Sequence, residues 1–535
     1  MTTTIPCTLS TLPADLLHVI LTFLDGQSIV RSSAVCRDWH ALASSSTQLQ
    51  YLIELWASGL EPNYSLGRSP VDKLQRLRAY RRAWSTLSWS QRTDWEIHPH
   101  PRAYELVGGV FAQHNTWPTS DFATIRLPSV DNGGDGEAQT RESVGVSSLD
   151  FCMDPTQDLV VFLYKEEYWS EQGNFDVRSI ETLQPHPLAA LPTLSFDLRD
   201  DSFRRIFLQV AEDVVGLLFR TSQVAEGSLR LVLFNWRTGA ALLDLASPQL
   251  PHSVSDFALL SPRSYVLASV NEAAYVPGMV KGTGELHIFA FDGTRCYSEP
   301  DRVLSLQLPA PHPNRLLERV IVHSGPYCAG PIPGAQFSQS NERRICVVSL
   351  AYDQAESYSL FIPHAYFARR IRERGEDTEP PRTIPWADWG PPNTRLLRGR
   401  HVFWLRYVHG ERVVSPVNSA YPLRIEVLDF GMLPERFADA ESKDPQFESK
   451  NANFKTAAAE FKTASESTPG TFTETHTQPS TVFRADTVFK DDVTTCLPYR
   501  RIVRELDQRH ILFLIDQDRI IGVNEGVNRL TVYAF

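Results

Sequence analysis

Few of the side chains that could carry chemistry stand at the spacings that such chemistry needs. Seven cysteines are scattered along the chain and none forms a CxxC pair, whereas zinc sites and redox motifs use closely spaced cysteines. His98 and His100 alternate with prolines, and no carboxylate or cysteine follows at ligand spacing, so an extended linker is favoured over a metal site. We therefore expect free, buried thiols in a reducing compartment, with no metal and no cofactor.

Glycine-rich segments likewise lack complete binding motifs. Residues 131–137 are acidic and rich in glycine, but the glutamate that completes a calcium-binding loop is missing, so a solvated turn is expected. Residues 282–284 lack the third glycine and the following helix of a dinucleotide-binding fingerprint. The serine-hydrolase, zinc-protease and P-loop signatures are absent. The sequence predicts no catalytic residue, although an active site built from scattered loop residues would leave no linear motif.

Composition indicates a soluble globular protein. Apolar residues make up 42% of the 535 residues and charged residues 21%, which is ordinary for a folded chain. The formal net charge of −11 argues against sequence-independent nucleic-acid binding, which depends on neutralising phosphates. No apolar run is long enough to span a membrane, and no basic residue precedes the first apolar stretch, as it would in a secretory signal. We expect no nucleic-acid partner, no membrane partner, and a location in the cytoplasm, the nucleus or both.

The N-terminal residues predict a small helical domain over 1–47, with three short helices between residues 11 and 45. Pro13 and Asp15 form a helix-start signal. The apolar residues that follow at helical spacing are Leu16, Leu17, Ile20, Leu21, Phe23 and Leu24. So short a unit cannot bury this much apolar surface alone, so we expect it to pack against a partner or a neighbouring domain.

Residues 48–93 predict a helical linker. Two apolar stripes run through this segment, and the second alternates with a set of basic residues. The basic residues are Lys73, Arg76, Arg78, Arg81 and Arg82. Because the whole chain is acidic, a solvated helix face is favoured over a nucleic-acid contact.

From about residue 94 the apolar pattern changes to short β-type runs such as 159–163, 214–219 and 231–234. Similar segments begin near residues 150, 207 and 256, a period of about 50 residues that is typical of four-stranded propeller blades. The chain is therefore predicted to be multidomain, α plus all-β, with a degenerate β-propeller of about seven blades over 94–535. Paired β-sandwiches are the alternative. Residues 435–482, rich in Ser, Thr, Lys and Glu, predict a mobile insertion.

Residues 12–42 resemble the F-box. The matching residues are Leu12-Pro13, Leu16-Leu17, Ile20 and Leu24, followed by Val35-Cys36, Trp39 and Leu42. Residues 49–59, the basic helix that ends at Trp84, residues 386–391 and residues 515–522 are similar to segments of a large group of fungal F-box proteins.

This resemblance implies a non-catalytic substrate receptor in a Skp–cullin–F-box ubiquitin ligase. Such a protein binds a Skp-family adaptor, and through it a cullin, while its C-terminal domain presents a protein substrate. The adaptor-binding residues would be Leu12, Pro13, Leu16, Leu17, Ile20, Leu24, Val35, Cys36 and Trp39. We expect Phe23, Val35 and Trp39 to lie partly in the internal core. A hydrolase or lyase with a central propeller pocket, and an F-box scaffold acting outside ubiquitination, are the alternatives.

Overall fold

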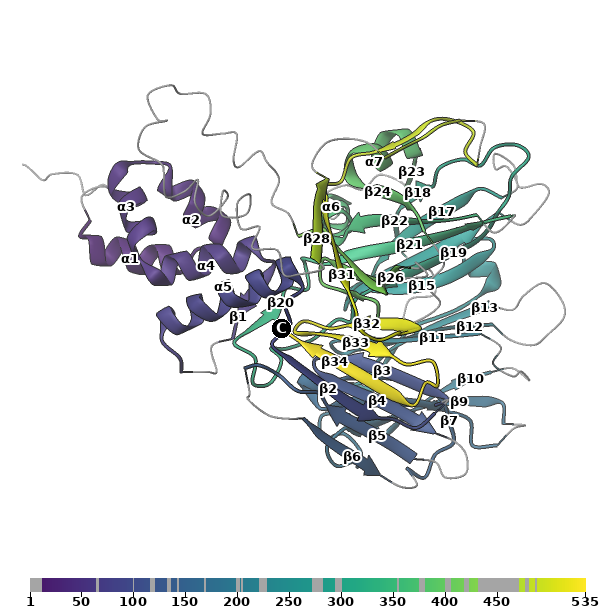
Figure 1. Cartoon of the computed structure of the whole chain (residues 1–535). Helices are drawn as coiled ribbons and strands as arrows, with labels where there is room; N and C mark the ends of the chain where they lie inside the picture. The colour runs from purple at the N-terminus through teal and green to yellow at the C-terminus, as the bar shows by residue number, and fades with distance from the viewer. Residues whose placement is uncertain are drawn as a thin grey trace, which may run out of the picture.

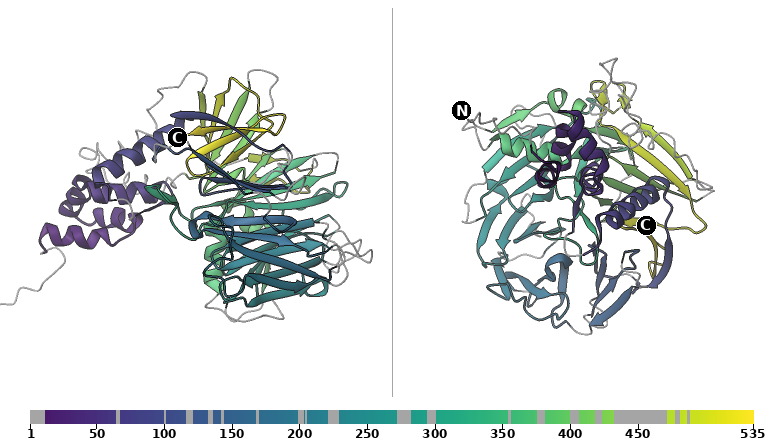
Figure 2. Two further views of the ribbon diagram at one scale, coloured as in Figure 1. Left: turned by 90° about the horizontal axis from the view of Figure 1, so that it is seen from below. Right: turned by 90° about the vertical axis from the view of Figure 1, so that its left-hand side faces the viewer.

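The computed structural model consists of a helical arm and a seven-bladed β-propeller (Figures 1 and 2). It describes residues 12–63, 67–99, 101–115, 121–131, 136–141, 144–167, 170–198, 203, 205–220, 229–271, 282–293, 301–353, 356–374, 381–399, 406–417, 423–431, 471–476, 481–485 and 488–535. This architecture confirms the predicted class and blade number. It also excludes the paired β-sandwiches, because the sheets follow one another around a ring.

Five helices build the arm. They are α1 (Ala14–Thr22), α2 (Gly26–Ser33), α3 (Arg37–Ser45), α4 (Thr47–Ala57) and α5 (Pro70–Thr86). Side-chain caps set three of the starts: Asp25, Ser46 and Ser69 each accept a hydrogen bond from a backbone N–H in the first turn of α2, α4 and α5. Leu87 ends α5 in the left-handed conformation, with φ of 47°.

The first four helices pack into one body. Leu21, Ile29, Ala43 and Leu49, one from each helix, form its buried core. Gly26 lets α2 approach α4 closely, because a Cβ there would overlap with Trp56 and lie 2.8 Å from the carbonyl oxygen of Leu52. The helix at the start of the expected 48–93 linker is therefore packed against the three helices that precede it.

The propeller is a ring of seven antiparallel blades (Figure 2, right). Blade 1 contains β3 (Ala103–Val107), β4 (Val110–Asn115), β5 (Asp121–Arg126) and β6 (Glu137–Arg141). Blade 2 contains β7 (Ser148–Asp154), β8 (Leu159–Tyr164), β9 (Gln172–Ser179) and β10 (Thr193–Asp197), with the 3-10 turn η2 (Pro155–Gln157). Blade 3 contains β11 (Arg205–Ala211), β12 (Val214–Arg220), β13 (Leu229–Asn235) and β14 (Ala241–Ala246), followed by η3 (Ser247–Gln249).

The remaining blades carry the additions to the simple four-stranded plan. Blade 4 contains β15 (Val254–Ser261), β16 (Ser264–Val270), β17 (Gly284–Ala290), β18 (Asp301–Gln307) and the parallel β23 (Arg382–Ile384). Blade 5 contains β19 (Leu317–Ser324), β21 (Ile345–Tyr352), β22 (Ser357–Pro363) and β24 (Arg395–Arg398), with α6 (His364–Arg374) and α7 (Trp386–Asn393) between its last two strands. Blade 6 contains β25 (Val408–His409), β26 (Arg412–Val417), β27 (Arg424–Asp429), β31 (Tyr499–Glu505) and β28 (Thr471–His476).

Blade 7 closes the ring with strands from both ends of the domain. It contains β32 (Leu512–Ile515), β33 (Arg519–Val523) and β34 (Arg529–Ala534), and β2 (Gln91–Glu96) pairs antiparallel with β34. The propeller therefore takes strand residues from position 91 onward, and its first strand in the sequence is an outer strand of its last blade.

Part of the segment expected to be a mobile insertion is a strand instead. Residues 432–470, the greater part of the expected 435–482 insertion, lie outside the described residues. Residues 471–476 form β28, which pairs along β31 at the edge of blade 6, and β29 (Thr481–Phe483) pairs with β30 (Val493–Thr495). The expectation is wrong for these two strands, because threonine favours extended structure when a neighbouring strand offers an edge to pair with.

Helix α5 joins the arm to the ring. Its buried residues are Leu74, Leu77, Tyr80 and Trp84. Trp84 stacks on Phe535 with ring centroids 4.1 Å apart, and the Tyr80 hydroxyl donates a 2.8 Å hydrogen bond to the carbonyl oxygen of Gln517. The arm is thus attached to blade 7 by a packed interface rather than by a bare linker.

One basic residue of α5 serves this attachment, and two others pair within the arm. Arg76 lies 2.6 Å from a carboxylate oxygen of Asp131 in blade 1, and Arg78 and Arg81 both pair with Glu54 of α4. Arg78 remains largely exposed, whereas Arg76 and Arg81 are mostly covered. Much of the basic face is therefore occupied by the chain's own carboxylates instead of being solvated.

Residues 325–344, here called the crossing segment, connect β19 to β21 of blade 5. They cross the middle of the propeller face that is turned toward the arm. The backbone N–H of Ala329 donates to Asp154 of blade 2 at 2.9 Å, and that of Gln339 donates to Gln517 of blade 7 at 2.8 Å. Within the crossing segment, β20 (Phe337–Gln339) pairs with β1 (Leu60–Pro62) of the arm. This end of the ring is therefore covered by the chain itself.

Replacing Phe535 by Ala is expected to lower the free energy of unfolding by about 3–5 kcal/mol, because it empties the space in which this ring stacks on Trp84. Urea denaturation followed by tryptophan fluorescence measures the loss. Arg529→Ala, at the exposed start of β34, the strand that ends just before Phe535, is the control and should stay within about 0.5 kcal/mol of the parent. Equal denaturation midpoints for F535A and the control would contradict this account of the junction.

Candidate functional site

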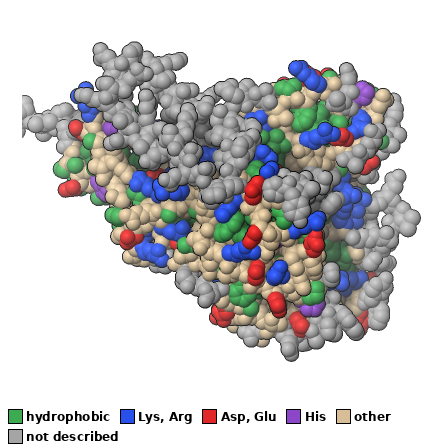
Figure 3. All heavy atoms as spheres, viewed as in Figure 1, with side chains coloured by type: hydrophobic (Ala, Val, Ile, Leu, Met, Phe, Trp, Pro, Cys, Tyr) green, Lys and Arg blue, Asp and Glu red, His purple; other side chains and the backbone are tan. Residues whose placement is uncertain are grey.

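The most unusual surface on the described chain is an apolar patch at the tip of the arm, here called the apolar face. It consists of Leu16, Val19, Ile20, Phe23 and Val35, which are 52, 49, 41, 84 and 69% exposed. In Figure 3, hydrophobic side chains appear together at this outer end of the arm. Large exposed patches on a folded surface mark interaction sites.

Helix α1 presents this face because it is apolar on two sides. Residues 16, 19, 20 and 23 form a stripe at the i, i+3, i+4, i+7 spacing of one helix face. Leu17 and Leu21 lie on the other side of α1 and are buried, at 6 and 2% exposure. The inner stripe packs on the arm, and the outer stripe is left uncovered.

The structure divides the predicted site residues between surface and core. Pro13, Leu16, Ile20, Val35 and Cys36 are exposed; Leu12, Leu24 and Trp39 are half-buried; Leu17 is buried. Leu17 is therefore part of the arm's own packing and is covered in the folded chain.

Two expectations about the core were wrong. Phe23 and Val35 are the most exposed residues of the apolar face, because Phe23 follows the last turn of α1 and Val35 lies in the α2–α3 turn. Trp39 is half-buried and packs against the arm core, as expected. Sequence reasoning also missed Val19, although the 16-19-20-23 spacing was a signal that could have identified the outer stripe.

Polar contacts hold the apolar face in position. The Asp25 carboxylate accepts from the backbone N–H of Ser28 at 2.8 Å and from its hydroxyl at 3.0 Å, and the N–H contact lowers the pKa of Asp25. His18 Nε2 lies 2.7 Å from the hydroxyl oxygen of Ser46, which caps α4. These contacts fix the turn after Phe23 and tie α1 to α4.

The cysteines are partly as expected. Cys152 and Cys346 are buried and free, and burial raises the pKa of the Cys346 thiol to about 12. Cys36, in contrast, is exposed beside Val35 at the start of α3.

Two kinds of feature are absent from the described residues. Among them, no group of three or more His, Cys, Asp or Glu side chains is arranged to hold a metal ion. No helix in this part of the chain combines the length and apolar character needed to cross a bilayer.

The neighbouring leucines of α1 provide a matched test of the two stripes. Leu17→Ala should lower stability by about 2–5 kcal/mol because it opens a cavity in the arm, whereas Leu16→Ala should change it by no more than about 0.5 kcal/mol. Hydrogen exchange of the α1–α3 amides reports the arm separately from the propeller. A loss of protection as large in L16A as in L17A would show that the outer stripe is packed as well.

Comparisons with known proteins agree with the arm's geometry. Residues 9–50 match the F-box-like family model, and no curated protein matches the chain. Solved structures with some likeness include Chaetomium thermophilum Sqt1 bound to the N-terminus of ribosomal protein L10, at 10% identity over 51% of this chain and 62% of that chain, with a TM-score of 0.28. Kuenenia stuttgartiensis hydrazine synthase is 9% identical over 56% of this chain and 84% of its own, with a TM-score of 0.30. The computationally designed Ika8 protein is 8% identical over 82% of this chain and 98% of its own, also with a TM-score of 0.30.

The family match covers α1, α2, α3 and the start of α4, the same helices that carry and support the apolar face. Residues 9–50 are therefore an F-box-like domain, which is joined to a seven-bladed β-propeller.

Proposed function

We propose that this protein is the substrate-recruiting subunit of a Skp–cullin–F-box ubiquitin ligase. The apolar face would bind the Skp-family adaptor, and the propeller would present a protein substrate. The observation that carries this proposal is the uncovered outer stripe of α1 within an F-box-like domain.

The amount of exposed apolar surface indicates how large the contact with the adaptor must be. The exposed fractions of the five residues of the apolar face together amount to about three whole side chains, worth about 4–9 kcal/mol when buried. Association costs about 4–15 kcal/mol, so the apolar face alone gives little surplus. A stable complex needs neighbouring surface too, and Pro13 and Cys36 are exposed beside it.

The attachment of the arm suits a receptor. Packing of α5 on blade 7 and the pairing of β1 with β20 hold the arm against one face of the ring. An adaptor on the apolar face would thus keep a constant orientation to a substrate on the propeller. The crossing segment covers the arm-side end of the ring, so we assign substrate binding to the far face and the rim.

The small cavity beneath the crossing segment gives no support to the alternative of an enzyme with a central propeller pocket. The cavity beneath the crossing segment is lined by Cys328, Gln339, Arg344 and His409 among others, and its volume is about 10 Å³. Such a volume has room for about one water molecule, whereas ligand pockets are usually about 300–1,000 Å³.

The first test measures how much adaptor and cullin co-purify with two full-length double variants, each of which adds two negative charges. Leu16→Asp with Phe23→Asp should reduce recovery of the Skp-family adaptor and the cullin at least about tenfold, because it places two charges in an apolar contact. Leu188→Asp with Leu191→Asp, at similarly exposed leucines of blade 2, should leave recovery unchanged. Undiminished recovery with the α1 variant, shown to be folded by its thermal midpoint, would refute the adaptor contact.

A second test separates a receptor from a scaffold. Proteins retained by the chain whether or not residues 1–47 are present are candidate substrates, and a receptor requires that their abundance rises when the protein is deleted. Stable levels of every retained protein would favour the scaffold role.

A further inference from the structure

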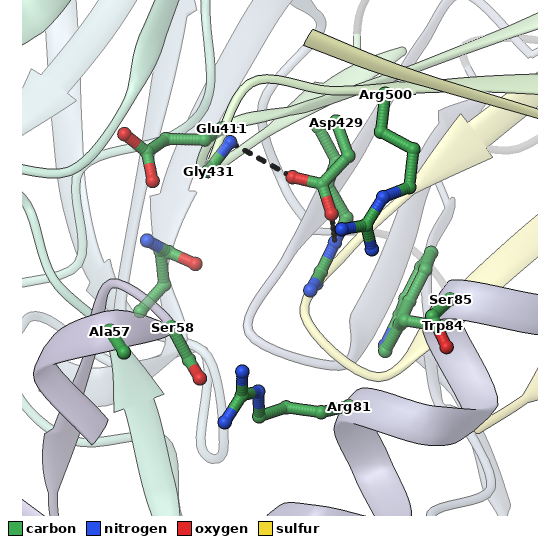
Figure 4. Close-up of a pocket in the computed structure, with 11 residues that line it drawn as sticks. Ala57, Ser58, Arg81, Trp84, Ser85, Glu411, Asp429, Gly431 and Arg500 are labelled. Carbon is green, nitrogen blue, oxygen red and sulfur yellow. Dashed lines mark hydrogen bonds and ion pairs between the residues drawn. The ribbon is translucent and has the colours of Figure 1, made fainter. Parts of the chain in front are cut away.

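A small polar cavity lies where the arm meets blade 6. Its volume is about 50 Å³, and its charged lining consists of Arg81, Arg412, Arg500, Asp429 and Glu411 (Figure 4). Arg81 comes from α5, whereas the other four belong to blade 6 or its turns. Three guanidinium groups and two carboxylates thus surround a space between the two parts of the molecule.

A buried hydrogen-bond donor in the wall of this cavity has no acceptor among the described residues. It is the indole Nε1 of Trp84, a side chain that is 1% exposed. Phe535 stacks on the indole ring, and the Arg412 guanidinium lies 4.5 Å from its centroid. Figure 4 shows the edge of Trp84 that carries the nitrogen turned toward the cavity. Buried donors are almost always satisfied, so this orphan points to an acceptor in the cavity.

The two carboxylates of the wall are already engaged. Glu411 accepts two hydrogen bonds from Arg343, at 3.0 and 2.8 Å. Asp429 accepts from the backbone N–H of Gly431 at 3.0 Å and lies 3.5 Å from Arg412 Nε. Neither carboxylate accepts a hydrogen bond from the indole N–H.

Among the described residues, guanidinium groups outnumber carboxylates around the cavity. Arg81, Arg343, Arg412 and Arg500 face three carboxylates, those of Asp429, Glu411 and Glu54, and Glu54 is shared with Arg78. Burial lowers the pKa of Arg500, and the charges of Arg81 and Arg412 lower it further while Asp429 opposes them. An anion in the cavity would relieve this excess.

We propose that the cavity binds one tetrahedral oxyanion, phosphate or sulfate. Guanidinium groups and an indole N–H are donors suited to such oxygens. The volume has room for about three to five water molecules, a size that one such ion fits. Because Arg81 and Trp84 belong to the arm and Arg412 and Arg500 to blade 6, the ion would bridge the arm and the propeller.

Strand β31 offers a matched control. Arg500 lines the cavity, whereas Arg501, on the opposite face of the strand, pairs with Glu426. Arg500→Gln and Arg501→Gln therefore remove the same charge from neighbouring positions, and only the first alters the cavity. Trp84→Phe removes the orphan N–H and keeps an aromatic ring over Phe535.

Calorimetric titration of the full chain with sodium phosphate, at constant ionic strength set by sodium chloride, tests the proposal. The parent and R501Q should show one saturable site, and R500Q should bind roughly tenfold or more weakly because a charged hydrogen bond is lost. W84F should weaken binding severalfold, which gives a second reading if R500Q folds poorly by circular dichroism. Phosphate should also raise the thermal midpoint of the parent and R501Q more than that of R500Q.

Absence of saturable phosphate and sulfate binding by the parent would overturn the proposal and leave the cavity to water. An equal loss of phosphate affinity in R500Q and R501Q would also overturn the proposal, since the affinity would then depend on net charge alone. Glycerol 3-phosphate is the additional titrant. If it binds as tightly as inorganic phosphate, the site accepts any phosphoryl group. If it binds more weakly than inorganic phosphate, the site is assigned to the free ion. Adaptor co-purification does not depend on this site, so either proposal can fail without the other.

Discussion

The packing of α5 on the closed ring is the interaction on which the rest of the structure depends. Four residues separate the end of α5 at Thr86 from β2, the strand that closes blade 7 by pairing with β34. The helix that holds the arm and the strand that closes the ring are therefore neighbours in sequence and in space. Because Trp84 stacks on Phe535 directly after β34, closing the propeller also positions the arm.

This arrangement separates two kinds of surface. The tip of the arm carries exposed apolar side chains, which we propose are buried by the adaptor. The base of the arm carries polar contacts to the ring: Arg76 pairs with Asp131 of blade 1, and the Tyr80 hydroxyl donates to the carbonyl oxygen of Gln517 in blade 7. Apolar contact at the tip can therefore be gained or lost while the polar base keeps the arm in place.

The crossing segment also joins the arm to the ring. Its backbone reaches blades 2 and 7, and its strand β20 pairs with β1 of the arm. The arm-side end of the propeller is thus occupied by contacts within the chain. Recognition surfaces on a rigid scaffold lie where loops are free to vary, which is why we propose the rim and the far face for substrate binding.

Local patterns predicted a large part of this molecule. The Leu-Pro start, the helical spacing of the first apolar residues and the period of the β runs depend on near neighbours, so they could be interpreted without tertiary structure. They correctly predicted the F-box-like helices, the blade number and strands such as β8 and β13.

Tertiary contacts decided the rest. Leu16 and Leu17 are equally apolar neighbours, and only the docking of α1 on α4 determines which of them is buried. Thr471–His476 become a strand because β31 offers an edge, although their composition alone suggested a mobile segment. The cavity at the base of the arm joins Trp84 to Arg500, which are more than four hundred positions apart. Sequence by itself determined which segments form helices and strands, whereas burial, pairing and charge clustering depend on residues that only the folded chain brings together.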